Sequence, residues 1–179
     1  MKILDIGCGR SKFPGAIGVD VNPQIEADVI HDLNIFPYPF EDNGFDEVYC
    51  DSILEHLDDI FKVMEEIHRI TVDRGTVRIK VPHYTSFDAH TDPTHTHFFT
   101  SRSFDYFRDD FVYNYYTTAR FDIVDIRVSF LKLKQFGGIS PHKLLGIEFF
   151  ANRWIKIYEA FFAYMFPAHI LSFTLQVIK

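Results

Sequence analysis

Cysteine is scarce in this sequence of 179 residues, which contains only Cys8 and Cys50. Two cysteines are too few for a disulfide framework, so we expect a protein of the reducing cytoplasm. No apolar run is long enough for a membrane-spanning helix. Met1 and Lys2 lead straight into a strand-like segment that ends in glycines, without the apolar core that a secretion signal requires. Neither a secreted disulfide-rich protein nor an integral membrane protein is therefore expected.

Positive charge is also scarce near the N-terminus. Residues 1–60 contain thirteen Asp and Glu against three Lys and Arg, whereas residues 61–179 contain twelve against fifteen. The net charge of −7 disfavours contact with phosphate backbones, so we expect no nucleic-acid partner. The acidic first third suits a cationic small ligand, although a solvated acidic surface also accounts for it.

Apolar periodicity and turn residues predict alternating strands and helices in a chain long enough for one domain. Asp58 is the expected N-cap of the first long helix, which should end near Asp73-Arg74-Gly75. Lys132 and Lys134 should be solvated. The predicted order of strand, connection, strand, helix and strand is typical of a parallel sheet with covering helices. We expect strands at 2–6, 16–21, 28–30, 45–50, 76–81, 121–130 and 170–178, a short helix at 101–111 and helical structure over 142–166.

Glycines follow the first predicted strand, and a carboxylate ends the second. Gly7 and Gly9 close the run Leu4-Asp5-Ile6-Gly7-Cys8-Gly9, and Asp20 ends the next strand. Glycine lets the backbone approach a ligand closely because it has no Cβ. A carboxylate at the second position can accept hydrogen bonds from ribose hydroxyls. Nicotinamide dehydrogenases and methyltransferases both use this arrangement.

Two residues favour the methyltransferase interpretation. Lys12 occupies the position at which a dinucleotide-binding motif requires its third glycine. Asp5 stands directly before the glycine turn, where it can reach an ammonium group rather than a pyrophosphate. A nicotinamide oxidoreductase is therefore disfavoured.

With this motif the sequence resembles the class I S-adenosylmethionine-dependent methyltransferases, and within them the type 11-like branch. The segments 27–33, 45–50, 53–57 and 69–81 resemble later motifs of that family in the same order. The resemblance implies that S-adenosylmethionine is the cofactor, with Asp5 at its amino-acid end, Asp20 on both ribose hydroxyls, and Asp32 and Leu33 at the adenine. The cofactor-binding residues that it implies are Asp5, Gly7, Cys8, Gly9, Asp20, Val21, Asp32, Leu33, Cys50 and Asp51.

The implied fold is an α/β, Rossmann-like three-layer sandwich. Its seven-stranded sheet is mostly parallel with an antiparallel last strand. Within one domain over 1–179, we expect a cofactor-binding half (1–81), an acceptor-side insertion (82–120) and the C-terminal strands and helix (121–179).

The first crossover is unusually short. Only nine residues separate Ile6 from Ala16, and Asp20 follows Gly7 by thirteen positions instead of about twenty. We therefore expect the first helix to have at most one turn or to be missing. A sheet face that lacks this helix would expose apolar surface, so a homodimer is expected to cover it.

Histidines and aspartates gather in the insertion, with four His and two Asp between positions 83 and 97. Such a group can bind Zn²⁺ or Fe²⁺, can shape an acceptor pocket, or can cap turns. We expect an acceptor pocket without stably bound metal. His83, His56 and Asp51 are the candidate general bases, should the acceptor have to lose a proton. The expected pocket residues are His83, Tyr84, His90, His95 and His97.

The segment 142–166 is apolar over most of a helical surface. Glu148, Asn152, Lys156 and Glu159 form one narrow polar stripe. Such a helix must bury its wide apolar face on the sheet, on a second subunit, or against a lipophilic ligand or membrane surface.

These observations favour an enzyme that transfers a methyl group to a small or lipid-like acceptor, with peripheral membrane contact as one option. The alternative is a catalytically silent protein that binds S-adenosylmethionine and acts as a regulatory or scaffolding subunit. A metal-dependent hydrolase built on the histidine segment is less favoured.

Overall fold

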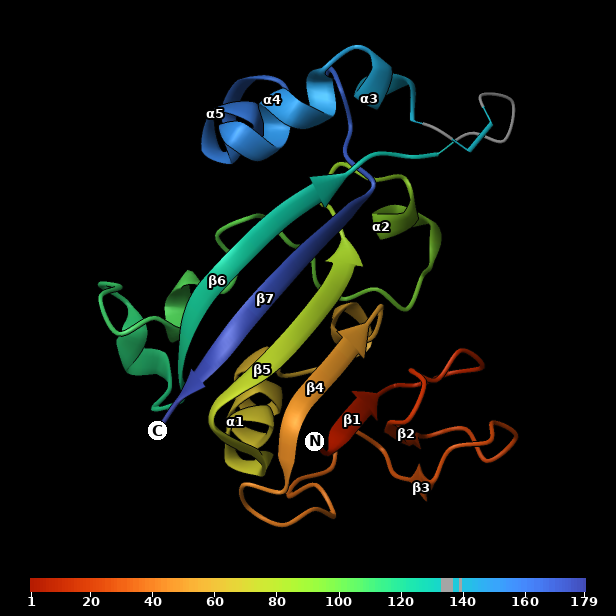
Figure 1. Ribbon diagram of the computed structural model, residues 1–179, viewed down its shortest axis with the longest axis vertical. Coiled ribbons are helices and arrows are strands. Elements are labelled where there is room, and N and C mark those ends of the chain that lie inside the picture. The colour runs from red at the N-terminus through yellow and green to blue at the C-terminus, as the bar shows by residue number, and fades with distance from the viewer. Residues whose placement is uncertain (133–136, 139) are drawn as a thin grey trace.

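One seven-stranded sheet runs through the computed structural model, which describes residues 1–132, 137–138 and 140–179 (Figure 1). The strand order is β3-β2-β1-β4-β5-β7-β6. The first five strands are parallel, and β7 pairs antiparallel with both β5 and β6. The expected mostly parallel Rossmann-like sheet with an antiparallel last strand is confirmed. The strands are β1 (Ile3–Ile6), β2 (Ile17–Asp20), β3 (Val29–Ile30), β4 (Phe45–Asp51), β5 (Thr71–Pro82), β6 (Arg120–Ser129) and β7 (Ile170–Ile178).

The longest helix, α1 (Ile60–Ile70), packs behind β4 and β5 as seen in Figure 1. Its fully buried side chains, Val63, Met64, Ile67 and Ile70, recur at helical spacing and join the core. Burying each such side chain contributes about 1.5–3 kcal/mol. The other described helices are η1 (Leu54–His56), α2 (Asp88–Thr91), η2 (Asp105–Phe107), η3 (Asn114–Tyr116), α3 (Pro141–Leu144), α4 (Ile147–Arg153) and α5 (Ile155–Phe161).

Both ends of α1 differ from expectation. The N-cap is Asp59, which accepts a hydrogen bond from the Lys62 N–H, and Asp58 lies outside the helix. The helix ends at Ile70 because the β-branched Thr71 takes an extended conformation and donates its hydroxyl back to the Ile67 carbonyl. The turn at 73–75 is instead an irregularity within β5, where the pairing with β4 shifts register.

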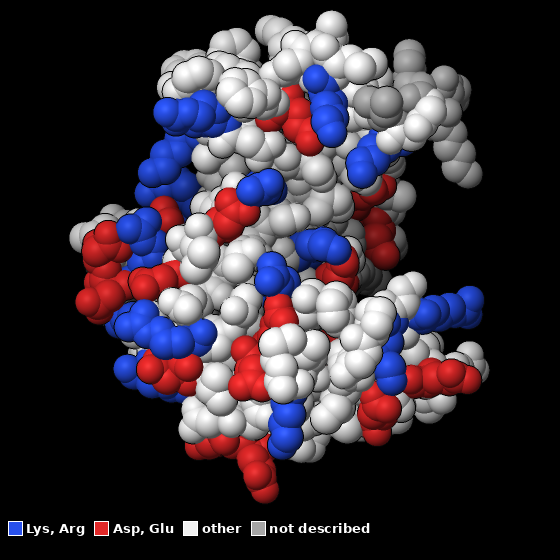
Figure 2. Space-filling view, viewed as in Figure 1, with Lys and Arg blue, Asp and Glu red and all other residues white. Residues whose placement is uncertain are grey.

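The sheet has a helical layer on one face only. In Figure 1 no helix lies in front of the strands, so among the described residues the expected third layer is missing. The bare face carries charged pairs, which Figure 2 shows side by side. Ion pairs join Arg78 to Glu47 at 2.5 Å and Lys80 to Asp51 at 2.7 Å. These charged pairs lie on the face where apolar surface was expected, and the homodimer stays a prediction.

The first crossover contains no helix, which agrees with the prediction of at most one helical turn. Its residues cover the sheet directly. The Phe13 ring stacks on Tyr49 of β4 with centroids 3.9 Å apart. Lys12 lies over Gly18 and reaches Asp28 at 2.8 Å. A Cβ on Gly18 would lie 2.5 Å from the Lys12 side chain, so glycine at this position lets Lys12 pack against the strand.

Two helical predictions were wrong in their extent. The segment 101–111 forms only the short 3₁₀ helix η2. The segment 142–166 forms three short helices, because Gly146 takes a left-handed conformation (φ 72°) and the backbone of Trp154 leaves the helical region (φ −135°, ψ 55°). Lys132 is exposed, and Lys134 lies outside the described residues.

Helices α3, α4 and α5 lie beyond one end of the sheet (Figure 1). Part of the apolar surface in this region is exposed. Polar residues make inward contacts: the Asn152 side chain bonds both backbone groups of Val128, and Glu159 accepts two hydrogen bonds from Ser101. No described helix is long and apolar enough to cross a bilayer. The exposed large apolar residues of this region are Leu144, Leu145, Phe149, Trp154, Ile157, Phe161, Tyr164 and Met165.

Candidate active site

A cavity of about 160 Å³ lies where β1 and β2 end. Because the carboxyl ends of parallel strands meet at one edge, the loops that follow them form this crevice together. Five residues expected at the cofactor are brought together here, with His56 beside them. The cavity is lined by Gly7, Asp20, Val21, Asp32, Leu33, Asn34, Ile53, His56 and Leu57.

The glycine turn is held tightly to the end of β2. Gly7 and Gly9 both have positive φ, 66° and 51°. A Cβ on Gly7 would lie 2.5 Å from the Ile53 side chain, whereas a Cβ on Gly9 would meet nothing closer than 4.0 Å. The backbone of Gly9 is therefore open to a ligand. Asp20 accepts hydrogen bonds from the N–H groups of Gly9 at 3.0 Å and Asn22 at 2.9 Å.

Five residues expected at the cofactor do not line the cavity, namely Asp5, Cys8, Gly9, Cys50 and Asp51. Asp5 accepts a hydrogen bond from the Phe13 N–H at 2.7 Å, and burial raises the pKa of its carboxyl group. Cys8 and Cys50 are buried packing residues, and burial raises the pKa of both thiols. Asp51 is exposed and pairs with Lys80 on the bare sheet face. Asp5 thus shapes the first crossover instead of lining the crevice.

His83 is fully buried, which contradicts its assignment as a general base in the pocket. Its Nδ1 lies 2.8 Å from the Thr85 hydroxyl, and its Nε2 lies 3.4 Å from the Glu159 carboxylate. Tyr84 donates its hydroxyl to the Glu159 carbonyl. Both residues therefore attach α5 to the end of β5. Neither lines the crevice, which the sequence alone did not indicate.

The remaining histidines of the insertion separate into three environments. His90 is exposed, bonds the Tyr84 carbonyl and stacks on Phe98. His95 packs against His56 with ring centroids 4.6 Å apart. Beside them Glu55 is 1% exposed, and burial raises its pKa to about 7. His97 belongs to the neighbouring pocket.

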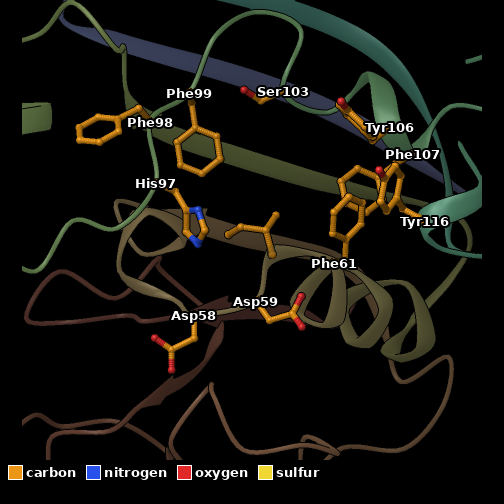
Figure 3. Close-up of a pocket in the computed structure, with 11 residues that line it drawn as sticks. Asp58, Asp59, Phe61, His97, Phe98, Phe99, Ser103, Tyr106, Phe107 and Tyr116 are labelled. Atoms are coloured by element: carbon orange, nitrogen blue, oxygen red, sulfur yellow. The ribbon is translucent and has the colours of Figure 1, made fainter. Parts of the chain in front are cut away.

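A larger pocket of about 550 Å³ opens between the start of α1 and the insertion (Figure 3). It adjoins the crevice along the chain, since Leu57 lines the crevice and Asp58 lines the pocket. Figure 3 shows aromatic rings along most of its wall and two carboxylates at one side. The lining residues are Asp58, Asp59, Ile60, Phe61, His97, Phe98, Phe99, Ser103, Tyr106, Phe107 and Tyr116.

Sequence reasoning missed several residues of this region. Asn34, Ile53 and Leu57 line the crevice. Ile53 and Leu57 lie in the segment 53–57 that resembles a family motif, and Asn34 directly follows Leu33. Asn34 accepts a hydrogen bond from the Asp58 N–H at 2.9 Å, a contact across 24 positions that no local pattern predicts.

Comparisons with known proteins agree with this geometry. A family model described as "Methyltransferase domain" matches residues 4–79. No curated protein matches the chain.

Solved structures extend the likeness to the whole chain. An S-adenosylmethionine-dependent methyltransferase from Archaeoglobus fulgidus is 19% identical with a TM-score of 0.66, covering 98% of this chain and 85% of its own. One from Mesorhizobium loti is 12% identical with a TM-score of 0.59, covering 98% and 90%. Phosphoethanolamine N-methyltransferase 2 from Haemonchus contortus, crystallised with S-adenosyl-L-methionine, is 17% identical with a TM-score of 0.56, covering 99% and 49%. The chain therefore has the fold of the class I S-adenosylmethionine-dependent methyltransferases, and its residues 4–79 match their type 11-like branch.

Proposed function

We propose that this protein transfers a methyl group from S-adenosylmethionine to an apolar, lipid-like acceptor. The observation that carries the acceptor class is the exposed apolar surface of α3, α4 and α5, which the fold leaves uncovered. A separate, largely aromatic pocket between α1 and the insertion supports the same class.

The crevice residues fit the cofactor. Asp20 ends β2 with a carboxylate that retains lone pairs for ribose hydroxyls after accepting two backbone hydrogen bonds. Asp32 and Leu33 line the same cavity and supply a polar group and an apolar surface for the adenine. Gly9 leaves room for the amino-acid portion. S-adenosylmethionine supplies an activated sulfonium methyl group, so the protein mainly has to orient the acceptor and exclude water.

The acceptor is assigned to the pocket of Figure 3. Phe61, Tyr106, Phe107 and Tyr116 provide the apolar wall that a lipid-like molecule requires. His97 is the one residue of the expected acceptor set that lines it. The chain passes from the crevice at Leu57 directly to the pocket at Asp58, which supports placing the acceptor next to the cofactor.

The surface of α3 to α5 suits contact with a lipid bilayer. Phe149, Phe161 and Tyr164 are each at least 73% exposed, which is unusual for such large apolar side chains. Lys143 and Arg153 are exposed on the same short helices and can attract anionic headgroups. Helices of this composition lie in the bilayer interface without crossing it. An enzyme held there meets lipid-like acceptors directly.

One observation favours the alternative of a silent cofactor-binding protein. Of the three candidate bases, His83 is fully buried and Asp51 pairs with Lys80, and neither lines the crevice. Only His56 lines the crevice.

The experiment is a methylation screen with radiolabelled S-adenosylmethionine. The purified protein is incubated with a total lipid extract and, separately, with a pool of polar metabolites. Label in the organic phase together with S-adenosylhomocysteine production supports the proposal. Label only in polar products contradicts the acceptor class, and cofactor binding without turnover in either pool supports the silent alternative.

A further inference from the structure

Three side chains of metal-ligand type meet beside the crevice. Glu55 and His56 come from η1, and His95 comes from the insertion. One potential ligand atom from each residue lies within 4.8 Å of the other two. His95 lies about forty positions after Glu55 and His56 in the sequence, so the fold creates the cluster.

The Glu55 carboxylate is buried without a hydrogen-bond partner among the described residues. Its side chain is 1% exposed, and neither carboxylate oxygen has a hydrogen bond within the part of the chain that the structure describes. A buried carboxylate in this position is costly unless a cation or a donor binds it.

The hydrogen bonds of the two imidazoles prepare them as ligands. His95 Nδ1 lies 3.1 Å from the Ala89 carbonyl oxygen, so this nitrogen donates and carries the proton. His56 Nδ1 lies 2.8 Å from the Thr94 hydroxyl, which itself donates to Asp92 at 2.7 Å, so His56 Nδ1 also donates. In both rings the Nε2 lone pair is left available. Fixing the tautomer through the other ring nitrogen is how proteins orient histidine ligands.

We propose that Glu55, His56 and His95 bind one Zn²⁺ ion through a carboxylate oxygen and the two Nε2 atoms. Two histidines and a carboxylate are the protein ligands of many catalytic zinc sites, which keep a fourth position open. Zinc ligands about 2 Å from the ion stand roughly 3.4 Å apart in a tetrahedron, so the cluster has to contract by small side-chain movements. This proposal replaces the expectation that the histidine segment works without stably bound metal.

The position of the site indicates its use, and this step rests on the proposed function. His56 lines the cofactor crevice as well as the cluster. An ion at the cluster would hold an oxygen-containing group of the acceptor at the edge of the crevice. The acceptor class is thereby narrowed to lipid-like molecules with a metal-binding oxygen.

The test is a zinc titration of protein made without an affinity tag and stripped with EDTA. Competition with a chromophoric chelator gives the zinc affinity, and Co²⁺ substitution reports ligand geometry by its visible absorption. We expect one ion per chain. Glu55→Gln and His95→Gln should each weaken zinc binding by more than the roughly 10- to 100-fold expected for Thr94→Val, which only orients His56. His90→Gln, in the same segment, is the matched control and should bind zinc as the wild type does.

The following results separate the possibilities. Less than stoichiometric zinc in the wild type, or equal zinc affinity in wild type, Glu55→Gln and His95→Gln, overturns the site. Circular dichroism checks that each variant folds. If a ligand variant does not fold, the zinc affinity of Thr94→Val tests the site instead. Calorimetry with S-adenosylmethionine runs in parallel on stripped and zinc-loaded protein. Cofactor binding without zinc binding overturns the metal site alone, whereas zinc binding without cofactor binding overturns the proposed function and leaves the metal site supported.

Discussion

The carboxylate of Asp20 accepts a hydrogen bond from the backbone N–H of Gly9 at 3.0 Å, which ties the glycine turn after β1 to the end of β2. Asp20→Ala should lower S-adenosylmethionine affinity by roughly ten- to more than a hundredfold, because lost hydrogen bonds to a carboxylate cost about 1.5–3 kcal/mol. Isothermal titration calorimetry measures this. Glu26→Ala, which removes an exposed carboxylate nearby, is the control, and an unchanged affinity in Asp20→Ala would remove Asp20 from the site.

Gly7→Ala should destabilise the protein more than Gly15→Ala does. Both glycines have positive φ, but a Cβ on Gly15 meets nothing within 4 Å, whereas one on Gly7 would overlap Ile53. Gly15→Ala therefore reports the backbone cost of about 1–2 kcal/mol, and Gly7→Ala adds an overpacking cost of about 1–3 kcal/mol. Urea denaturation measures both. Adding Ile53→Ala should recover part of the Gly7→Ala loss, and equal losses at the two glycines would contradict the packing argument.

Stability should fall in mild acid through His68. Its Nε2 lies 2.8 Å from the Ile178 carbonyl, and burial lowers its pKa from the usual 6.5. Below about pH 6.5 the unfolded chain therefore binds this proton more readily than the folded protein, so stability is lost as the pH drops through the folded-state pKa. The free energy of unfolding at about pH 7.5 and about 5.5 should differ less in His68→Gln than in wild type. The same pH dependence in both proteins would exclude His68 as a source.

The exposed aromatics of α4 and α5 should carry lipid binding. We expect Phe149→Ser and Phe161→Ser each to reduce co-sedimentation with anionic liposomes by roughly tenfold or more, since burying a Phe contributes about 1.5–3 kcal/mol. Val112→Ser and Val124→Ser remove apolar residues exposed elsewhere and should bind as wild type does. Equal loss in the two sets would point to a nonspecific effect and not to this surface.

Truncation of the pocket wall should affect the acceptor and not the cofactor. Tyr116 lines the pocket and is 57% exposed, so Tyr116→Ala should fold normally. We expect the KM for the acceptor to rise by roughly tenfold, the effect of about 1–2 kcal/mol of lost apolar contact. Steady-state kinetics gives this value, and calorimetry should show unchanged S-adenosylmethionine affinity. A change in cofactor affinity with an unchanged acceptor KM would place the acceptor elsewhere.

The sequence alone determined the strands and the glycine turn. Strand formation follows from short apolar runs bounded by turn residues. Gly7, Gly9 and Asp20 belong to one unit of strand, loop and strand, so their geometry depends on residues close in sequence. Chain length limited the first crossover to a helix of at most one turn, because a helical crossover between parallel strands needs about ten to twelve residues or more.

Only the tertiary structure decided which side chains of the insertion reach the crevice. His83 turns to Glu159, 76 positions away, and His95 meets Glu55 and His56 across a gap of about forty. The sequence likewise did not show that the apolar surface of α3 to α5 faces outward. A helical periodicity separates a polar stripe from an apolar one, but it does not say which faces the protein. Asn152 settles this by bonding both backbone groups of Val128 on the edge strand, because an unpaired edge must be satisfied by whatever donor and acceptor the fold brings to it.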